Sequence, residues 1–344
     1  MAHNWLLYIA AFASAFAISI VVTPIAKVIS IKLGAIDYPK DRGMHKKPMP
    51  RMGGIAIVCG FLLTVLMLSS FINELEMKKI FGLIIGSVII AVLGAVDDVK
   101  NLSAKFKLFV QIIAALVVVF SGVRINFVVW PFTMIFEALS IPFTLVWIIG
   151  VTNAVNLIDG LDGLAAGVSS IAALSIMVLC ILTGSETAVV LMAALAGACI
   201  GFLPRNFNPA EIFMGDTGAT FIGFVLSVTS IIGLFKGYNI LALVVSIFCL
   251  GLPIFDTLFA MGRRAINHKP IMQADRGHLH HRLIDKGYSQ KQAVVTLYVL
   301  SAVCGLLAIA ISARDIRVFA IVLITAAALS CMIYYFNRTR KKRP

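Results

Sequence analysis

Long apolar segments alternate with short polar loops along the whole chain. A membrane-spanning α-helix needs about 20 mostly apolar residues, within a range of roughly 17–25. The pattern predicts eleven spans, at residues 5–30, 52–71, 80–96, 106–121, 143–158, 164–182, 187–203, 217–234, 239–261, 292–312 and 317–336. We therefore expect an all-α polytopic membrane protein, with residues 1–344 in a single membrane domain.

The segment between the fourth and fifth spans departs from the helical pattern. Residues 124–130 alternate weakly and are rich in β-branched and aromatic side chains, and Pro131 and Pro142 interrupt the region 122–142. This composition favours a short β-hairpin or an interfacial segment.

The composition agrees with a membrane protein. Of the 344 residues, 60% are hydrophobic and 13% are charged, and the mean hydropathy is +0.99. Soluble proteins carry about twice that charged fraction. The first apolar segment is too long for a signal-peptide core and follows no basic region, so we expect it to be retained as a span. The six cysteines are scattered singly within apolar segments, which predicts neither a disulfide framework nor a zinc site.

Basic residues are distributed unequally between the two sides of the predicted bundle. If the loops alternate between the sides, six of the 29 Lys and Arg residues lie on the side of the N-terminus and 23 on the other. The positive-inside rule makes the second side cytoplasmic, with the N-terminus and the region 122–142 outside and the C-terminal tail inside. In such a protein the net charge of +13 indicates cytoplasmic loops and anionic ligands, and no nucleic-acid partner is expected.

The polar sequence Asn153-Ala-Val-Asn156-Leu-Ile-Asp159-Gly-Leu-Asp162-Gly163 lies between the fifth and sixth spans. A carboxylate near hydrocarbon costs roughly 2.5–3.5 kcal/mol on insertion scales and indicates a functional site. Residues three or four apart on a helix share a face, which would align Asn156, Asp159 and Asp162. Oxygen ligands on one face suit a hard cation such as Mg²⁺. A polar loop that only joins two helices is the alternative.

Three further carboxylates are expected at the same membrane surface. Asp97 and Asp98 are adjacent at the end of the third span. Neighbours on a helix point about 100° apart, so one of them could act as a base or positioning group while the other lies near a metal. Asp216 occupies an N-cap position just before the eighth span. Ordinary helix caps are the alternative for all three residues.

Cations accumulate on this side as well. Arg51 precedes Gly53 and Gly54, and glycines at the start of a helix let backbone amides approach an anion. A basic cytoplasmic loop is the alternative. A cluster near the C-terminal end contains His278, His280, His281 and Arg282. Neighbouring arginines and the lack of cysteines favour phosphate over zinc as the ligand of this cluster.

Together these residues suit phosphoryl transfer, in which carboxylates hold Mg²⁺ and cations hold phosphate. Such catalysis consists mostly of positioning and charge neutralisation. The chain has no Walker A sequence, which argues against an ATP-driven motor. A secondary transporter for an anionic sugar nucleotide is the alternative of another class. Against it, the predicted acids lie at one membrane face rather than near the midplane.

At these positions the chain closely resembles the polyprenyl-phosphate N-acetylhexosamine-1-phosphate transferases. The resemblance covers nearly the whole length and rests on Pro48-Met-Pro-Arg51-Met-Gly-Gly54, Asp97-Asp98, the stretch from Asn153 to Gly163, the stretch from Asn206 to Gly218, and the histidine cluster. The His-Leu-His-His-Arg form is similar to that of the branch that starts teichoic acid, O-antigen or enterobacterial common antigen synthesis. The branch that transfers MurNAc-pentapeptide phosphate typically has a different histidine run and is kept as the alternative.

The resemblance implies transfer of GlcNAc-1-phosphate from UDP-GlcNAc to undecaprenyl phosphate, with release of UMP, at the cytoplasmic face of a bacterial plasma membrane. It implies Mg²⁺, with Mn²⁺ as a substitute, held by Asp216 and Asp98. The implied catalytic residues are Asp97, Asp98, Asp159, His280 and His281. The implied substrate-binding residues are Arg51, Asn153, Asn156, Asp162, Asn206, His278 and Arg282. Direct attack and a covalent aspartyl intermediate have both been argued for the family, and the sequence favours neither. Apolar faces of the spans also allow a homodimer.

Overall fold

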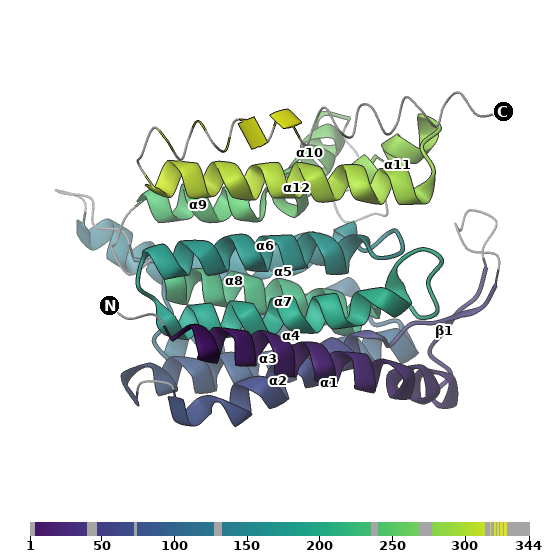
Figure 1. Ribbon diagram of the computed structural model, residues 1–344, viewed down its shortest axis with the longest axis horizontal. Helices are drawn as coiled ribbons and strands as arrows, with labels where there is room; N and C mark the ends of the chain where they lie inside the picture. Colours follow the sequence, from purple (N-terminus) through teal and green to yellow (C-terminus); the bar gives the residue numbers. More distant parts are fainter. Residues whose placement is uncertain are drawn as a thin grey trace.

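The protein is a bundle of α-helices (Figure 1) in a computed structural model that describes residues 4–39, 47–71, 74–126, 133–234, 240–267 and 277–313, with isolated positions beyond. The elements are α1 (Trp5–Lys32), β1 (Ile36–Asp37), β2 (Met49–Pro50), α2 (Gly54–Met67), a 3₁₀ turn (Ser69–Phe71), α3 (Glu74–Lys100), α4 (Ala104–Phe120), α5 (Thr133–Ile158), α6 (Leu164–Leu182), α7 (Glu186–Asn206), α8 (Gly215–Leu234), α9 (Ile240–Cys249), α10 (Gly251–Ile266), α11 (Leu279–Asp285) and α12 (Gln290–Ala313).

Seven of the described helices are long and apolar enough to cross a membrane: α1, α3, α5, α6, α7, α8 and α12. The helices α9 and α10 meet at an angle of 89° and would make an eighth span if counted together. The predicted class, an all-α polytopic membrane protein, is therefore confirmed. The count of eleven stays a prediction, because α2 has 14 residues and α4 has 17, and the predicted span 317–336 lies largely outside the described residues.

The ninth predicted span, 239–261, is broken between Cys249 and Gly251. Pro253 follows as the third residue of α10. A proline is tolerated in the first turn of a helix, where its missing N–H would have no partner in the helix. The local sequence Gly251-Leu-Pro253 therefore suits a new helix start better than the middle of a continuous span.

The predicted outer-side hairpin is wrong for residues 133–142, which form the first turns of α5. Pro142 lies inside this helix, and membrane helices tolerate proline because neighbouring groups satisfy the freed backbone. The Thr144 hydroxyl of α5 accepts the Ile125 N–H at 2.9 Å and so anchors the chain after α4. The remaining part, 127–132, lies outside the described residues. Strand pairing occurs instead between β1 and β2, which are antiparallel with Ile36 opposite Pro50.

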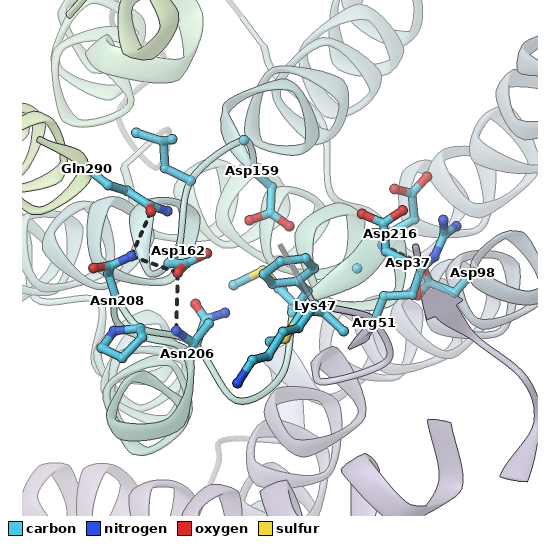
Figure 2. A pocket seen from close by; sticks show the side chains of 18 of the residues that line it. Asp37, Lys47, Arg51, Asp98, Asp159, Asp162, Asn206, Asn208, Asp216 and Gln290 are labelled. Atoms are coloured by element: carbon cyan, nitrogen blue, oxygen red, sulfur yellow. Dashed lines mark hydrogen bonds and ion pairs between the residues drawn. The ribbon is translucent and has the colours of Figure 1, made fainter. Parts of the chain in front are cut away.

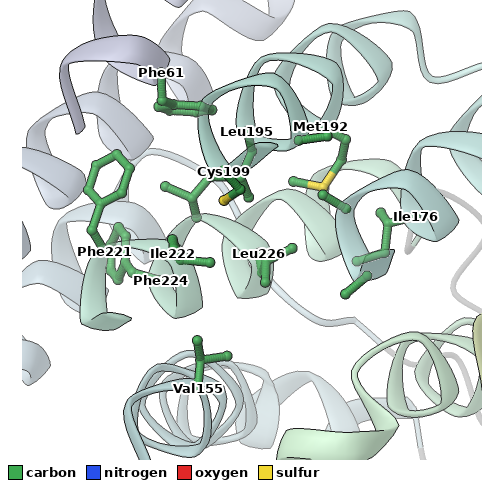
Figure 3. Close-up of a cluster of buried hydrophobic side chains, with 14 of the residues drawn as sticks. Phe61, Val155, Ile176, Met192, Leu195, Cys199, Phe221, Ile222, Phe224 and Leu226 are labelled. Carbon is green, nitrogen blue, oxygen red and sulfur yellow. The ribbon is translucent and has the colours of Figure 1, made fainter. Parts of the chain in front are cut away.

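Helix α8 forms the centre of the bundle and is buried along its whole length. It packs against α2, α3, α5, α6 and α7. Figure 3 shows its Phe221, Phe224 and Leu226 side chains among residues of these neighbours. The rings of Phe61 and Phe221 meet edge to face with centroids 5.7 Å apart. Because α8 is covered on every side beyond its first two residues, the polar start of this helix is held at a fixed place.

Glycines bring α2 and α3 against the start of α8. A Cβ on Gly54 would lie 2.1 Å from the Gly218 nitrogen, and one on Gly94 would lie 2.5 Å from the Thr217 Cα. The N–H groups of Gly53 and Gly54 donate to the carbonyls of residues 213 and 214, at 2.9 and 2.8 Å. The two adjacent glycines therefore serve close backbone packing here and not the amide–ligand contact expected from the sequence.

Candidate active site

A cavity of about 730 Å³ opens at the end of the bundle where α3, α5 and α7 finish and where α6 and α8 begin. In Figure 2 the Asp159 carboxylate lies between two groups of polar side chains, one around Asp162 and the other around Asp216. The lining residues include Asp37, Lys47, Arg51, Asp98, Asp159, Asp162, Asn206, Asn208, Asp216, His281 and Gln290. The structure thus brings together carboxylates from four distant parts of the sequence.

Asp98 uses both of its carboxylate oxygens to hold the start of α8. Its Oδ1 accepts the Asp216 N–H at 3.0 Å and Arg51 Nε at 3.2 Å. Its Oδ2 accepts the Thr217 N–H at 3.0 Å and the Thr217 hydroxyl at 2.6 Å. A carboxylate offers about four lone-pair sites, so these four donors occupy it. The contacts give Asp98 a positioning role and leave little of it for a metal ion.

Asp216 lies in the first turn of α8, one residue inside the helix, so the predicted N-cap position is wrong. The reason is that Asp98, 118 residues away in the sequence, supplies the capping oxygens. An anion at a helix N-terminus is favoured by the exposed N–H groups and the helix dipole. The Asp216 side chain is left to face the cavity, where it contacts Lys107 at 2.9 Å.

Asp97 does not line the cavity, and it anchors the loop between α3 and α4. Its Oδ1 accepts the Leu102 N–H at 2.6 Å, and its Oδ2 accepts Lys107 Nζ at 2.8 Å. Lys107 therefore bridges Asp97 and Asp216. Lys107 was not among the predicted site residues. Its position within the predicted span 106–121 nevertheless indicates an ionic partner, because a lysine within an apolar span is usually paired.

Asp159 differs from the other cavity carboxylates discussed above because, in the described part of the chain, its negative charge is not balanced by a nearby partner. It follows the end of α5 in a turn that contains Gly160 and Gly163, the latter with φ of 79°, so it does not share a helical face with Asp162 as predicted. Among the described residues, no cation or hydrogen-bond donor contacts its carboxylate. Burial, and after it the neighbouring carboxylates with Asp216 first, raise the pKa of Asp159 to about 8.

Asp162 and Asn206 hold two loops of the cavity wall together. Asp162 Oδ2 accepts the Asn208 side-chain amide at 3.0 Å and the Ala210 N–H at 3.1 Å. Asn206, which is buried, accepts the Gly163 N–H at 3.1 Å and donates to the Ile212 carbonyl at 3.0 Å. Both residues line the cavity as expected for substrate contacts, while these hydrogen bonds also give them a structural task.

Helix α12 contacts both of these loops, the one that follows α5 and the one that follows α7. Gln290 accepts a hydrogen bond from the Asn208 side chain at 2.6 Å. Two turns further on, the Tyr298 hydroxyl donates to the Gly163 carbonyl at 2.5 Å. A Cβ on Gly167 would overlap the Tyr298 ring, so a glycine on α6 is needed for the tyrosine to reach the loop.

We predict that Tyr298→Phe weakens the placement of the Asp159 loop without unfolding the protein. One neutral hydrogen bond is lost, about 1 kcal/mol, and turnover should fall several-fold with little change in melting temperature. Tyr288→Phe is the matched control, because Tyr288 lies just before α12 and no described contact uses its hydroxyl. Equal effects of the two variants on the turnover number would contradict this role for Tyr298.

The histidine cluster is only partly directed at the cavity. His281 lines it, and His280 is buried with its ring where a Cβ on Gly160 would stand, 2.3 Å from Nε2. Burial, and after it the neighbouring His281 ring, lowers the pKa of His280 to about 4, so His280 is neutral near pH 7. The His278 ring contacts Asp256 of α10 at 2.9 Å, and Arg282 is exposed outside the cavity lining.

The two asparagines of α5 also lie outside the cavity lining. Asn153 donates to the Gln111 side chain of α4 at 2.8 Å and to the Ile149 carbonyl at 2.8 Å. The Asn153 amide therefore joins α5 to α4 at Gln111, which lies one helical turn after Lys107. Asn156 is half-buried. The predicted substrate contacts of Asn153 and Asn156 stay predictions.

The donor set fits a hard divalent cation. Across the described ranges, no three His, Cys, Asp or Glu side chains are close enough to hold a metal ion by themselves. Mg²⁺, however, is usually bound by one or two carboxylates together with waters and substrate phosphates. Asp159 and Asp216 are two such carboxylates facing one cavity, and the uncompensated charge on Asp159 would be relieved by a cation between them.

Comparison with known proteins places the chain in a family. The description "Glycosyl transferase family 4" matches residues 80–234. A probable undecaprenyl-phosphate N-acetylglucosaminyl 1-phosphate transferase of Bacillus subtilis (strain 168) is 42% identical over 86% of this chain and 83% of its own. A decaprenyl-phosphate N-acetylglucosaminephosphotransferase of Mycolicibacterium smegmatis is 33% identical over 79% and 74%. A phospho-N-acetylmuramoyl-pentapeptide-transferase of Borrelia hermsii is 30% identical over 86% and 92%.

The helical bundle and the acidic cavity define an integral membrane protein built to hold a charged ligand at one end of its spans. The chain belongs to glycosyl transferase family 4, among its polyprenyl-phosphate N-acetylhexosamine-1-phosphate transferases. The resemblance read from the sequence is thereby confirmed, and the transporter alternative loses its support.

Proposed function

We propose that the protein transfers GlcNAc-1-phosphate from UDP-GlcNAc to undecaprenyl phosphate and releases UMP. Identity to the B. subtilis relative is 42%, against 30% for the MurNAc-pentapeptide transferase of B. hermsii, which supports N-acetylglucosamine as the sugar. The observation that carries the proposal is the cavity at the end of the membrane spans, where the Asp159 and Asp216 carboxylates face each other with Arg51 and Lys47 in the wall.

The chemistry needs charge neutralisation more than a strong base. A phosphate monoester has a second pKa of about 6, so the lipid phosphate is largely deprotonated near pH 7. One of its oxygens forms a bond to the β-phosphorus of UDP-GlcNAc. The bond from that phosphorus to the bridging oxygen breaks, and UMP leaves with the electron pair. The overall balance is the same whether the lipid attacks directly or a carboxylate first takes up the sugar phosphate.

The residues of the cavity divide this task between them. Asp159 and Asp216 would hold Mg²⁺, which when bound neutralises phosphate charge as a Lewis acid. Asp98 keeps Asp216 in place through its backbone N–H. Lys107 pairs with Asp97 and Asp216 and lies outside the cavity lining, so it would steady the Asp216 carboxylate and not contact the phosphates itself. Asp97 could act on the lipid phosphate only by giving up part of its ion pair with Lys107.

The distribution of charge supports a location in the plasma membrane of a bacterial cell, with the cavity on the cytoplasmic side. The loops that meet at the cavity belong to the set that the sequence predicts to carry most of the Lys and Arg residues, and the positive-inside rule assigns such loops to the cytoplasm. UDP-sugars are charged and would reach the cavity from the cytoplasm, while the lipid phosphate would reach it from the inner leaflet.

We expect purified protein in lipid to release UMP only when UDP-GlcNAc, undecaprenyl phosphate and Mg²⁺ are all present. Chelation by EDTA should stop the release, and Mg²⁺ or Mn²⁺ should restore it. UDP-MurNAc-pentapeptide in the same assay should give at most a trace of the rate. A higher rate with the pentapeptide substrate would show that the protein acts as a MurNAc-pentapeptide-phosphate transferase. Counterflow of nucleotide in proteoliposomes without UMP formation would show that it is a transporter and not an enzyme.

A further inference from the structure

A second groove lies between α3 and α4, at the end of this helix pair remote from the active-site cavity. Its volume is about 490 Å³. Its walls are apolar and come from Phe81 and Ile85 of α3 and from Ile113, Val117 and Phe120 of α4, with Lys78 and Ser121 as polar members. The groove is open to the surroundings of the bundle, and several of its wall residues, such as Phe81 and Phe120, are strongly exposed.

A glycine sets the depth of this groove. A Cβ on Gly82 would lie 2.1 Å from the Ser121 hydroxyl oxygen, so α3 and the end of α4 touch at its floor. Lys78 and Ile85 are separated by seven residues, about 10 Å along the helix axis. One leaflet of the hydrocarbon core is about 15 Å thick, half of about 30 Å. The groove is therefore as long as a substantial part of one acyl chain.

The position along α3 places the groove in the leaflet opposite the cavity. Lys78 and Asp97 are nineteen residues apart, about 29 Å along the helix, which is close to the full hydrocarbon thickness. The Lys78 ammonium then stands at headgroup depth, with the apolar walls extending toward the membrane centre.

Cations outnumber acids by three to two at this end of the helix pair, counting Glu74 and Glu76 in the first turn of α3. Lys78 lies in its lining, Lys79 is next to it, and Arg124 follows the end of α4. Glu76 is two residues before Lys78 and is not part of the lining. Only six Lys and Arg residues are expected on this side of the membrane, and three of them gather at this pair of helix ends. An apolar slot that ends in cations at headgroup depth matches a lipid with a negative headgroup.

We propose that the groove binds one phospholipid with an anionic headgroup. An acyl chain lies between Phe81, Ile85 and Val117, and the phosphate lies beside the Lys78 ammonium. The lipid contacts α3 and α4 together. These are the two helices whose other ends carry Asp97, Asp98 and Lys107, so a bound lipid steadies the pair that positions this part of the active site.

The test compares lipids that differ only in headgroup. Native mass spectrometry of detergent-purified protein is performed with phosphatidylglycerol and with phosphatidylcholine of identical chains. Wild-type protein should retain one phosphatidylglycerol with at least about a fivefold preference. Lys78→Gln should lose the preference while still binding either lipid weakly. Val117→Trp fills the groove and should retain neither. Lys105→Gln, which changes an exposed lysine at the other end of α4, is the control and should behave as wild type.

Three results would overturn the proposal. The first is retention of phosphatidylglycerol by Lys78→Gln and Val117→Trp at the wild-type level. The second is loss of retention in Lys105→Gln to the same extent as in Lys78→Gln, because the effect would then be general surface charge. The third is a mass of two chains without lipid that reverts to one chain in Val117→Trp, because the groove would then be a contact between copies of the protein.

Discussion

Replacing Asp159 by asparagine is expected to reduce UMP release at least about 100-fold and, at the same time, to make the metal-free protein more stable at alkaline pH. The loss of activity follows from removing one of the two carboxylates that face the phosphates across the cavity, since groups aimed at transferring phosphate contribute at least this much. The gain in stability follows from the missing partner of this carboxylate among the described residues.

The sign of the pH effect comes from comparing the folded and unfolded states. The folded pKa of Asp159 is about 8, whereas an unfolded aspartate has a pKa of about 3.9. Between these values the folded state binds more protons, so the stability that protonated Asp159 contributes is fully present below about pH 3.9, falls progressively above it and is lost once the pH has risen through about 8. The asparagine variant cannot ionise. It should melt close to wild type at pH 4 and several degrees higher at pH 9, with a smaller gain at pH 6, all in EDTA.

Glu211→Gln is the control for this measurement. Glu211 is a half-exposed carboxylate paired with Lys27 and Arg205 and lies outside the cavity lining. The same carboxylate-to-amide change there should leave UMP release and the pH dependence of melting unchanged. Added Mg²⁺ should raise the melting temperature of wild type at pH 8 more than that of Asp159→Asn. A difference in melting temperature between wild type and Asp159→Asn that stays constant from pH 4 to pH 9 would show that the pKa of Asp159 is not raised in the folded protein.

The meeting of the acids at one end of the bundle could be predicted because loop parity is a global property of the sequence. Once the spans were counted alternately, Asp97, Asp159 and Asp216 had to emerge on the same side. The length of each apolar segment likewise predicted the class of fold. The class of fold depends on one segment at a time and therefore stands although the number of spans stays open, whereas the loop parity depends on the order of all the spans.

The hydrogen-bond partners of these acids could not be predicted. An apolar pattern indicates that a segment is buried, but it does not indicate which residue of another helix contacts it. Nothing local connects Asp98 to Thr217, or Asn153 to Gln111, and each contact depends on two helices crossing at a glycine or an amide pair. The end of α5, by contrast, has a local signal in the sequence. Gly160 and Gly163 are close enough together to end a helix, so the shared helical face of Asp159 and Asp162 was the weaker interpretation of that stretch.

Replacing Asp98 by asparagine is expected to lower both stability and activity, because it damages the start of α8 and, through it, the placement of Asp216. An amide side chain has one acceptor oxygen in place of two, so at least one of the four donors that Asp98 now satisfies is left without a partner. Hydrogen bonds to charged groups contribute about 1.5–3 kcal/mol each, and the unfolding free energy should fall by about 2–4 kcal/mol. UMP release should fall about 10- to 100-fold, since small displacements of positioned groups have effects of this order.

Two threonines of α8 separate this positioning role from a direct role in the reaction. Thr217→Val removes one of the donors to Asp98 and should show a smaller loss of the same kind, in stability and in turnover together. Thr229→Val removes a buried hydroxyl that has no hydrogen-bond partner within the described residues, so it should be neutral in both measurements. If Asp98→Asn abolished UMP release while leaving the melting temperature and the Thr217→Val activity at wild-type levels, Asp98 would act on the substrate or the metal itself. The hydrogen bonds at the start of α8 would then be incidental to catalysis.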